Sequence, residues 1–338
     1  MPELPDLTYD EVVRATERLG ARVRPVTVTP PDPAARPGAG VTSDGGEESG
    51  GGVWLALEFL QHTGSFKARG ALNFLSAAVA AGTVPEAGVT IASGGNAGLA
   101  CAWAARQLGV PATVFVPETA PAVKVARLRG YGADVRLAGR EYAEAAEACA
   151  KFTAASGALA SHAYDHPLIA AGAGTIVGEL LARVPGLDTV VVAAGGGGLF
   201  AGVATAARHH GLRAVFVEPR GCATLHAALR AGRLVDVPVD SVAVDSLGAR
   251  RATALALDAA RHDLVSGVLV DDEDIIRTRR LLWDDRRLAV EHAAATALAG
   301  VARTASSGYT PDPSETVAVV LSGANTDPGD LARTGTAD

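Results

Sequence analysis

The sequence predicts an α/β protein built from two doubly wound open-sheet domains, and three observations support this. From Val89 onward, β-rich runs alternate with alanine-rich helical patterns, which is typical of parallel strands joined by crossover helices. A second series of the same kind begins at Thr189. With 338 residues, 48% of them hydrophobic, the chain can bury the cores of two such domains.

The first series predicts a small domain over residues 86–162. Its expected strands are VTIA, ATVFVP and ADVRL. Its expected helices are LACAWAARQLG, APAVKVARLRGYG and EYAEAAEACAKFTAA. The runs rich in β-branched residues favour strands, and the alanine-rich runs favour helices.

The second series predicts a larger domain made of residues 1–85 and 163–338. Its expected strands are TVVVAA, RAVFVEP, VSGVLV and TVAVVLS. Its expected helices are GLFAGVATAARHH, CATLHAALRAG, DDEDIIRTRRLLWDD and LAVEHAAATALAGVAR, and an amphipathic helix is expected within residues 1–20. Residues 31–52 are dominated by Pro, Gly and small polar residues, so we expect a flexible surface loop there.

Composition and charge exclude several classes of partner and location. The 37 acidic and 30 basic residues give a net charge of −7, which provides no basic patch for a nucleic acid. The three cysteines form no C-x-x-C pair, so we expect a reducing cytoplasm and neither a disulfide framework nor a thiolate metal site. The N-terminus lacks the basic and apolar regions of a signal peptide, and glycines interrupt the longest apolar runs. We therefore expect no secretion and no membrane span.

Lys67 is the first residue with chemical significance. It lies in the segment EFLQHTGSFKARGALNFL, among small and aromatic residues and ahead of a helical pattern. Burial at such a position would lower the pKa of the amine and make it a usable nucleophile and base. A surface lysine whose aliphatic stem lies along the start of an apolar helix would have the same sequence context. Other segments must therefore show whether Lys67 is a reactive amine or a surface residue.

Four consecutive glycines, Gly195 to Gly198, follow the strand TVVVAA and precede a helix that begins near Leu199. Without side chains, this segment can close its backbone amides around an anion at the helix N-terminus, an arrangement that holds phosphate. The segment lacks the lysine of a Walker loop and the spacing of the dinucleotide fingerprint, so nucleotide binding is less favoured. A purely structural glycine turn would have the same sequence.

Polar residues follow two further expected strands. After VTIA come Ser93, Gly94, Gly95 and Asn96, whose amides and short hydroxyl suit a substrate carboxylate. Asn96 can also hydrogen-bond a phenolic oxygen, although Ser and Asn are ordinary helix caps. After TVAVVL, the hydroxyl of Ser322 can donate to an acceptor such as a pyridine nitrogen, or it can belong to a simple turn.

The chain resembles the fold-type-II pyridoxal-phosphate enzymes, most closely the serine/threonine dehydratase and serine racemase branch. The resemblance covers nearly the whole chain and is carried by five segments in the family's order: LQHTGSFKARGA, PETAPAVKVARLRGYGADV, AGAGTIVGEL, AAGGGGLFAGVA and LSGANTD. It implies a fold like that of the tryptophan synthase β-subunit. It also implies pyridoxal 5′-phosphate as cofactor, a small amino acid as substrate and a homodimer.

The resemblance also implies roles for the residues singled out above. Lys67 would be the Schiff-base lysine and the catalytic base, with Phe66 near the cofactor ring and Asn96 at its phenolic oxygen. Ser322 would face the pyridine nitrogen. The phosphate would lie in a loop of five residues: Gly195, Gly196, Gly197, Gly198 and Leu199. The substrate would bind the loop after VTIA: Ser93, Gly94, Gly95, Asn96 and Ala97.

Several positions depart from the commoner dehydratase pattern. Ala97 stands where a His is usual, and Ala173 stands where a Gln is usual in the G-x-G-T turn. Both changes remove a side chain near the expected substrate, which suggests an enlarged pocket. His292 replaces a Pro after Glu291, and DSLG around Ser246 replaces an Asp-Gly pair, so the sequence leaves open which residues contact the exposed face of the ring.

No metal site is expected. The family's cation site resembles a Glu that ends a strand and an Asp six residues later; here Glu218 is present, but Thr224 takes the second position. A hard divalent ion thereby loses a charged ligand. His209 and His210 are consecutive, so their side chains diverge on a helix, and no third ligand is placed beside them.

The leading interpretation is an ammonia-lyase that removes the β-hydroxyl of L-threonine or L-serine, giving a 2-oxo acid and ammonia. A serine at the pyridine nitrogen leaves the ring uncharged, which favours elimination. Gly94 has no side chain to protonate Cα on the face opposite Lys67, so an amino-acid racemase is less favoured. A lyase or β-replacement enzyme for a bulkier β-substituted amino acid also fits the motifs, and a non-enzymatic cofactor carrier fits them least.

Overall fold

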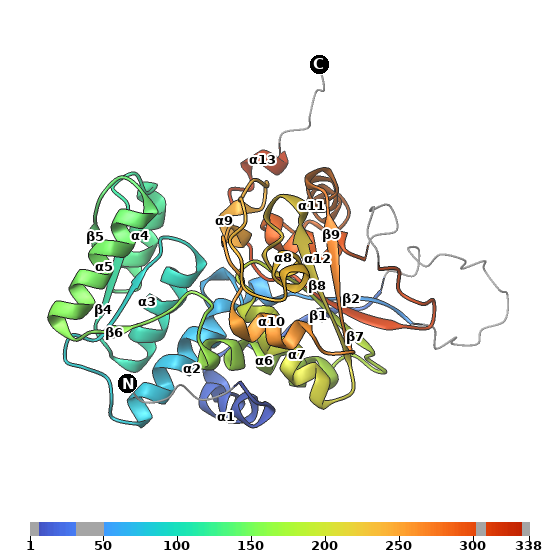
Figure 1. Cartoon of the computed structure of the whole chain (residues 1–338), viewed down its shortest axis with the longest axis horizontal. Helices are drawn as coiled ribbons and strands as arrows, with labels where there is room; N and C mark the ends of the chain where they lie inside the picture. The colour runs from blue at the N-terminus through green and yellow to red at the C-terminus, as the bar shows by residue number, and fades with distance from the viewer. Residues whose placement is uncertain (1–6, 32–50, 302–308, 333–338) are drawn as a thin grey trace, which may run out of the picture.

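The computed structural model describes residues 7–31, 51–301 and 309–332, which form an α/β structure with two separate open sheets (Figure 1). The predicted fold class is therefore confirmed. Of the loop predicted over residues 31–52, residues 32–50 lie outside the described part of the chain. Gly52 is the first residue of a strand, so that loop prediction extends one residue too far.

The smaller sheet has four parallel strands in the order β5-β4-β3-β6. Their bounds are β3 Val89–Ala92, β4 Ala112–Val116, β5 Asp134–Leu137 and β6 Leu159–Ala160. Three crossover helices connect them: α3 Asn96–Leu108, α4 Ala122–Gly130 and α5 Tyr142–Ser156. All three predicted strands and all three predicted helices of the first series are confirmed, whereas β6, only two residues long, had no counterpart among the predictions.

The larger sheet has six strands in the order β1-β2-β10-β7-β8-β9, and only β1 is antiparallel to its neighbour. Their bounds are β1 Val28–Thr29, β2 Gly52–Ala56, β7 Thr189–Ala193, β8 Arg213–Pro219, β9 Val265–Val270 and β10 Thr316–Val320. The four predicted strands of the second series are confirmed. Strand β2 was not predicted; it begins at Gly52, the last residue of the segment expected to be a loop.

Helices cover both faces of the larger sheet, and α1, α2 and α6 lie between it and the smaller one (Figure 1). The bounds are α1 Tyr9–Leu19, α2 Lys67–Ala80, α6 Pro167–Leu181, α7 Gly198–His209, α8 Thr224–Ala231, α9 Val244–Leu247, α10 Ala254–Ala260, α11 Asp272–Arg286, α12 His292–Ala299 and α13 Gly329–Ala332. Short 3₁₀ turns span Gly20–Arg22, Glu58–Leu60, His62–Gly64 and Arg220–Cys222.

One helix boundary differs from its prediction. The expected helix LAVEHAAATALAGVAR begins only at His292, because Glu291 is extended, with φ −67° and ψ 157°, and acts as the N-cap. The backbone amide of Glu291 is instead bonded to the carbonyl of Gly323 at 2.9 Å. This extended backbone directs the Glu291 carboxylate away from the helix.

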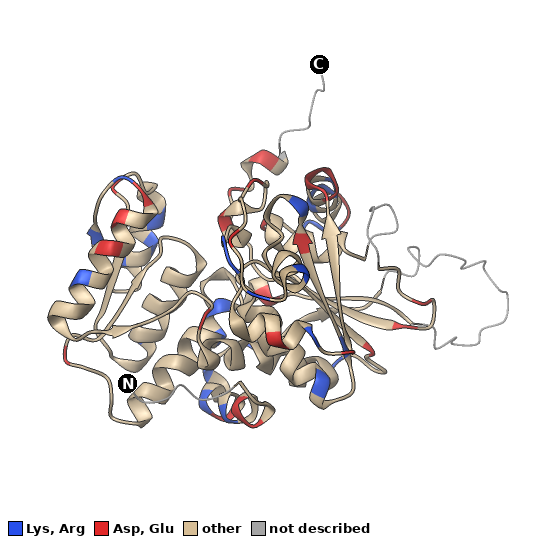
Figure 2. Cartoon of the chain, in the orientation of Figure 1, with Lys and Arg blue, Asp and Glu red and all other residues tan. Residues whose placement is uncertain are grey.

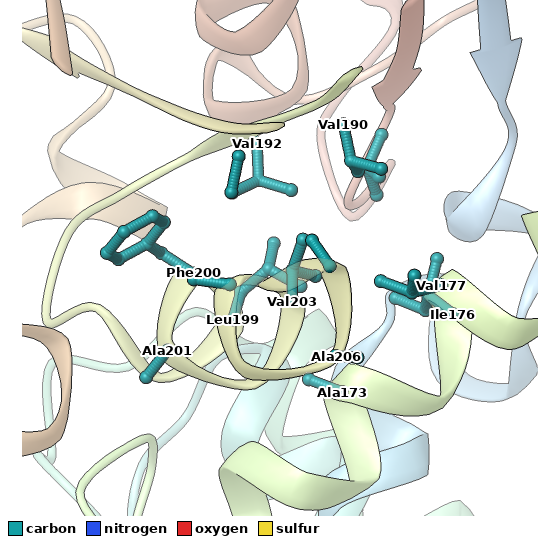
Figure 3. Packing of buried hydrophobic residues seen from close by; sticks show 14 of the residues in the cluster. Ala173, Ile176, Val177, Val190, Val192, Leu199, Phe200, Ala201, Val203 and Ala206 are labelled. Atoms are coloured by element: carbon teal, nitrogen blue, oxygen red, sulfur yellow. The ribbon is translucent and has the colours of Figure 1, made fainter. Parts of the chain in front are cut away.

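The core beneath the larger sheet packs α7 and α6 against β7. Figure 3 shows Val190 and Val192 of β7 above Val203 of α7, with Ile176 of α6 beside them. Ala173 belongs to this core and is only 1% exposed. The segment expected to be a G-x-G-T turn is therefore interior helix. The idea that the small residue at 173 enlarges the substrate pocket is wrong.

Helix α2 shares its core with the smaller sheet. Leu72 and Leu75 of α2 belong to the same buried cluster as Ile91 of β3 and Leu99 of α3. We propose residues 86–162 as the small domain, with α2 as the helix on which it rests. All four strands of the smaller sheet lie within that range.

Charged residues of both signs are interspersed on the outer helices, for example on α5 and α11 (Figure 2). Within the described ranges, no helix combines the length and the apolar character needed to cross a bilayer.

Candidate active site

Each sheet has a switch point at which its strand order reverses. In the smaller sheet β3 has β4 on one side and β6 on the other, and in the larger sheet β7 has β8 on one side and β10 on the other. Ligands of open α/β sheets bind outside the carboxyl ends of the strands at such points. The predicted site residues follow three of these strands: residues 93–97 after β3, residues 195–199 after β7 and Ser322 after β10.

Lys67 is the first residue of α2 and is held next to the end of β10. The backbone amide of Phe66 donates to the carbonyl of Ser322 at 3.0 Å, and Ser65 forms a β-bridge with Gly323. These contacts place Lys67, Phe66 and Ser322 together, as the sequence predicts.

The amine of Lys67 is set up to lose its proton readily. Its Nζ atom donates to the carbonyl of Ala163 at 2.9 Å. Burial lowers the pKa of Lys67 to about 8, against the opposing effect of the Glu291 carboxylate. A lysine amine with such a pKa is a substantial fraction neutral at physiological pH and can act as a nucleophile or base.

The glycine loop forms the N-terminal end of α7. Gly197 has φ +93°, a backbone conformation that favours glycine, and a Cβ on Gly196 would lie 2.3 Å from the ring of Tyr164. The loop carbonyls point into the protein: Gly195 O accepts from the Thr224 hydroxyl at 2.6 Å, and Gly196 O accepts from Thr253 N at 3.0 Å. The first amides of a helix have no partner within it, so this end of α7 offers donors to a phosphate.

Asn96 starts α3 and reaches across to the larger sheet. Its Nδ2 atom donates to both carboxylate oxygens of Glu291, at 2.9 and 3.0 Å, and its Oδ1 accepts from Asn325 Nδ2 at 2.6 Å. Glu291 is only 6% exposed and also accepts from the Ser246 hydroxyl at 2.6 Å. This buried carboxylate beside Lys67 and Asn96 is a site residue that the sequence motifs did not identify.

In the loop after β3, Gly95 has open space where a Cβ would lie, whereas Gly94 does not. A Cβ on Gly94 would meet Val116 Cγ1 at 3.3 Å, and Gly95 N donates to the Ser93 hydroxyl at 3.3 Å. Ala97 lines a small pocket beside Lys67, so the position at which Ala replaces the usual His borders the site. The pocket lining includes Phe66, Lys67, Ala97, Ala100, Ser161 and His162.

The residues after β6 complete the site and were missed in the sequence. Ser161, His162 and Ala163 follow this strand at the switch point of the smaller sheet. The His162 Nδ1 atom accepts from Asp165 N at 2.9 Å, and burial lowers its pKa, with Asp165 opposing and Lys67 adding to the effect. A recognisable strand before Ser161 would have predicted these residues as part of the site. Strand β6, which pairs with β3, has only two residues and is too short to recognise in the sequence.

The segment after β6 also links the lysine to the glycine loop. Ala163 accepts the hydrogen bond from Lys67, and its neighbour Tyr164 packs against Gly196 and Gly198. The structure thus connects Lys67 to the phosphate-binding candidate through a segment absent from the predicted site.

Glu218, the last polar residue of β8, does not fit a divalent cation. It is fully buried, and its Oε1 accepts from Leu225 N at 2.8 Å and from the Thr224 hydroxyl at 3.1 Å. Its Oε2 accepts from His226 N at 2.9 Å and lies 2.6 Å from His226 Nδ1. Protein donors therefore surround the carboxylate, where a cation would require further oxygen ligands.

The consecutive histidines show no metal-binding geometry. His209 and His210 are exposed and contact Tyr9, which stacks on His209 at 3.6 Å and shares a 2.9 Å hydrogen bond with His210. Among residues 7–31, 51–301 and 309–332, no group of three or more His, Cys, Asp or Glu could hold a metal ion.

Comparison with known proteins gives consistent matches. Residues 41–323 match the family described as "Pyridoxal-phosphate dependent enzyme". The chain is 38% identical to an L-threonine ammonia-lyase of Geobacter sulfurreducens, over 83% of this chain and 69% of the relative. It is 36% identical to a serine dehydratase-like protein of Rattus norvegicus, over 81% of this chain and 85% of the relative. The solved structure of maize serine racemase superposes with a TM-score of 0.82 and 28% identity, over 96% of this chain and 95% of that one.

The site fits the family's cofactor on structural grounds. The buried Lys67 amine can bond an aldehyde, and the N-terminal end of α7 can hold a phosphate. A larger residue at Gly196 would force the ring of Tyr164 to move. The chain belongs to the pyridoxal-phosphate dependent enzyme family, and its cofactor is pyridoxal 5′-phosphate.

Proposed function

We propose that the chain is an ammonia-lyase that removes the β-hydroxyl of L-threonine or L-serine and yields a 2-oxo acid and ammonia. The observation that carries this proposal is that an acid–base side chain is available on one side only. Lys67 supplies a buried amine with a pKa of about 8, whereas Gly94, expected on the opposite face of the substrate, has no side chain. The similarity to proteins named L-threonine ammonia-lyase and serine dehydratase-like supports it.

The proposed cofactor site uses residues from both switch points. We propose that Lys67 bonds the cofactor, with Phe66 beside the ring and Asn96 at its phenolic oxygen. The phosphate would be held by the glycine loop: Gly195, Gly196, Gly197, Gly198 and Leu199. When bound, pyridoxal phosphate supplies an aldehyde and a conjugated ring that withdraws electrons from Cα.

The protein's own groups then direct the reaction. The substrate carboxylate would bind the backbone amides of the loop after β3: Ser93, Gly94, Gly95, Asn96 and Ala97. Lys67 Nζ would take the Cα proton. The hydroxyl of Ser322 would donate a hydrogen bond to the ring nitrogen without protonating it, so the ring would be a weaker electron sink, which favours loss of the β-hydroxyl.

The lowered pKa of Lys67 predicts how the apoprotein takes up its cofactor. Only the neutral amine attacks the aldehyde, so the rate of cofactor capture should rise about tenfold per pH unit below pH 8 and level off above it. Stopped-flow absorbance between pH 6 and pH 10 measures this. The variant Glu291→Gln removes the charge that raises the Lys67 pKa, so its midpoint should fall below that of the wild type. A wild-type midpoint near 10.5, the ordinary lysine value, would contradict the assignment.

The side-chain-free position 94 predicts elimination without racemisation. A proton donor must approach Cα to about 3 Å, and no side chain at Gly94 can do so from the face opposite Lys67. With L-serine in D₂O, the wild type should release pyruvate and form no D-serine. Gly94→Ser should form D-serine once the Val116 methyl, which a Cβ there would meet at 3.3 Å, shifts by a few tenths of an ångström. Appreciable D-serine from the wild type would instead favour a racemase, which the match to maize serine racemase supports.

A substrate panel tests the proposed function as a whole. Purified holoenzyme would be given L-threonine, L-serine, their D-enantiomers and larger β-substituted L-amino acids, and 2-oxo acid release would be followed. We expect L-threonine and L-serine to be the best substrates. If only the larger amino acids react, the chain is a lyase or β-replacement enzyme for bulkier substrates, and the space left by Ala97 accounts for it.

We also propose a homodimer that works in a reducing cytoplasm. Cys101, Cys149 and Cys222 are all buried and free, which suits a reducing compartment. The dimer is expected from the family resemblance, and light scattering of the holoenzyme tests it.

A further inference from the structure

We propose that Arg127 is a positioning residue of the active site, which acts through Asn325 to fix the side-chain amide of Asn96. The expected effect of Arg127 on turnover rests on the proposed function. The hydrogen bonds from which we infer its role are present in the protein without substrate or cofactor. We call Arg127, Asn325, Asn96 and Glu291 the cleft network.

The cleft network joins the two sheets. Arg127 lies on α4 of the smaller sheet, and its Nη2 donates to Oδ1 of Asn325, which follows β10 of the larger sheet, at 2.7 Å. Asn325 Nδ2 donates to Asn96 Oδ1 at 2.6 Å, and Asn96 Nδ2 donates to Glu291 at 2.9 Å. An unbroken series of donors and acceptors thus runs from an exposed arginine to a buried carboxylate.

The end groups of the network fix the direction of every bond. A guanidinium can only donate and a carboxylate can only accept, whereas an asparagine amide can reverse its oxygen and nitrogen by a half turn. Because Arg127 requires the oxygen of Asn325, the Asn325 amino group faces Asn96. Asn96 must then direct its own amino group toward Glu291 and the cofactor side of the site.

The same network reaches the turn that positions Lys67. Asn325 Nδ2 also donates to the carbonyl of Thr63 at 2.7 Å. Thr63 has φ +66°, a left-handed conformation that is uncommon for a non-glycine residue and needs support from its surroundings. Loss of Arg127 would remove the only donor to Asn325 Oδ1 among the described residues, so the Asn325 side chain would be held only through its amino group, by Thr63 O and Asn96 Oδ1. Docking of α4 therefore supports Asn325, which contacts both the Asn96 amide and the turn before Lys67.

The first test uses matched arginine variants of α4 in the holoenzyme. Arg127→Met removes the donor and keeps the bulk, Arg127→Lys restores a donor, and Arg129→Met is the control. Arg129 is exposed on the same helix, and its side chain has no hydrogen bond within the described residues. We expect Arg127→Met to lower kcat about tenfold with KM changed less than about twofold, because the network orients the Asn96 side chain, whereas the substrate carboxylate would bind the backbone amides of that loop. Arg127→Lys should recover most of the loss.

The second test needs no turnover. Trp103 of α3 stacks on His62, in the turn before Lys67, with ring centroids 4.7 Å apart. In a background with Trp54→Phe and Trp283→Phe, Trp103 is the sole tryptophan and reports on the contact between α3 and this turn. Its emission in the apoprotein should change in Arg127→Met and remain unchanged in Arg129→Met.

The outcomes separate this proposal from the proposed function. If no amino acid is turned over, the proposed function fails, and the Trp103 signal alone decides the role of Arg127. Equal kcat and equal Trp103 emission in Arg127→Met and Arg129→Met would overturn the proposal. So would a kcat loss that Arg127→Lys does not relieve, because the effect would then not depend on a donor.

Discussion

Replacing Lys67 with alanine should abolish both the visible absorption band of the bound cofactor and turnover. Lys67 is the only one of the chain's three lysines that is buried in the site; Lys124 and Lys151 lie on the outer helices α4 and α5. The same amine bonds the cofactor and acts as base in the proposed reaction. The loss of activity should therefore be on the order of 10⁴-fold, the upper end for acid–base catalysis alone.

Lys151→Ala is the matched control for this experiment. Its side chain is 74% exposed and pairs with Glu147 one helical turn away, so its removal should leave both spectrum and activity unchanged. Absorbance spectra of the purified proteins, followed by assays of 2-oxo acid release, provide the measurement. A Lys67→Ala protein that keeps the wild-type spectrum would refute the assignment of Lys67 as the bonding lysine.

The sequence predicted the parts of the site that follow long strands. VTIA, TVVVAA and TVAVVLS are recognisable by their β-branched residues, so the loops after them could be placed at strand ends. The glycine run and the lysine segment carry their own chemical signals. What brings these loops together is the strand order, which depends on pairings far apart in sequence, such as β2 with β10.

The remainder of the site lacks any local signal. His162 and Tyr164 follow a strand of two residues, and Glu291 lies within a segment whose alanines predict helix. Glu291 became a site residue only because Ser246, Asn96 and Asn325 converge on its carboxylate from distant parts of the chain. The misplacement of Ala173 has the same origin, since a small residue among glycines suits a tight helix contact as well as a turn.

A buried ion pair beside Lys67 predicts the largest effect on stability. Arg69 is completely buried on α2, two residues after Lys67. Its Nη2 and Nε atoms bind both carboxylate oxygens of Glu58, at 2.7 and 2.9 Å, and its Nη1 binds Glu179 at 2.6 Å. Burial alone would lower the pKa of Arg69, but the two carboxylates raise it above its usual value, so the guanidinium stays charged.

Arg69→Met should lower the free energy of unfolding by about 3–5 kcal/mol, because Glu58, only 1% exposed, would be left as an unpaired buried charge. Urea unfolding of the apoprotein measures this. The double variant Arg69→Met/Glu58→Gln should recover part of the loss, since Glu58 is then uncharged, and Glu179, which is 24% exposed, still accepts from the backbone amide of Val26. Arg251→Met, which breaks a similar two-bond pair with Asp236 on the exposed surface, should leave stability nearly unchanged. If Arg69→Met and Arg251→Met prove equally stable, the buried pair does not anchor α2, and the position of Lys67 must depend on the contacts of Phe66 and Ser65 with the end of β10 alone.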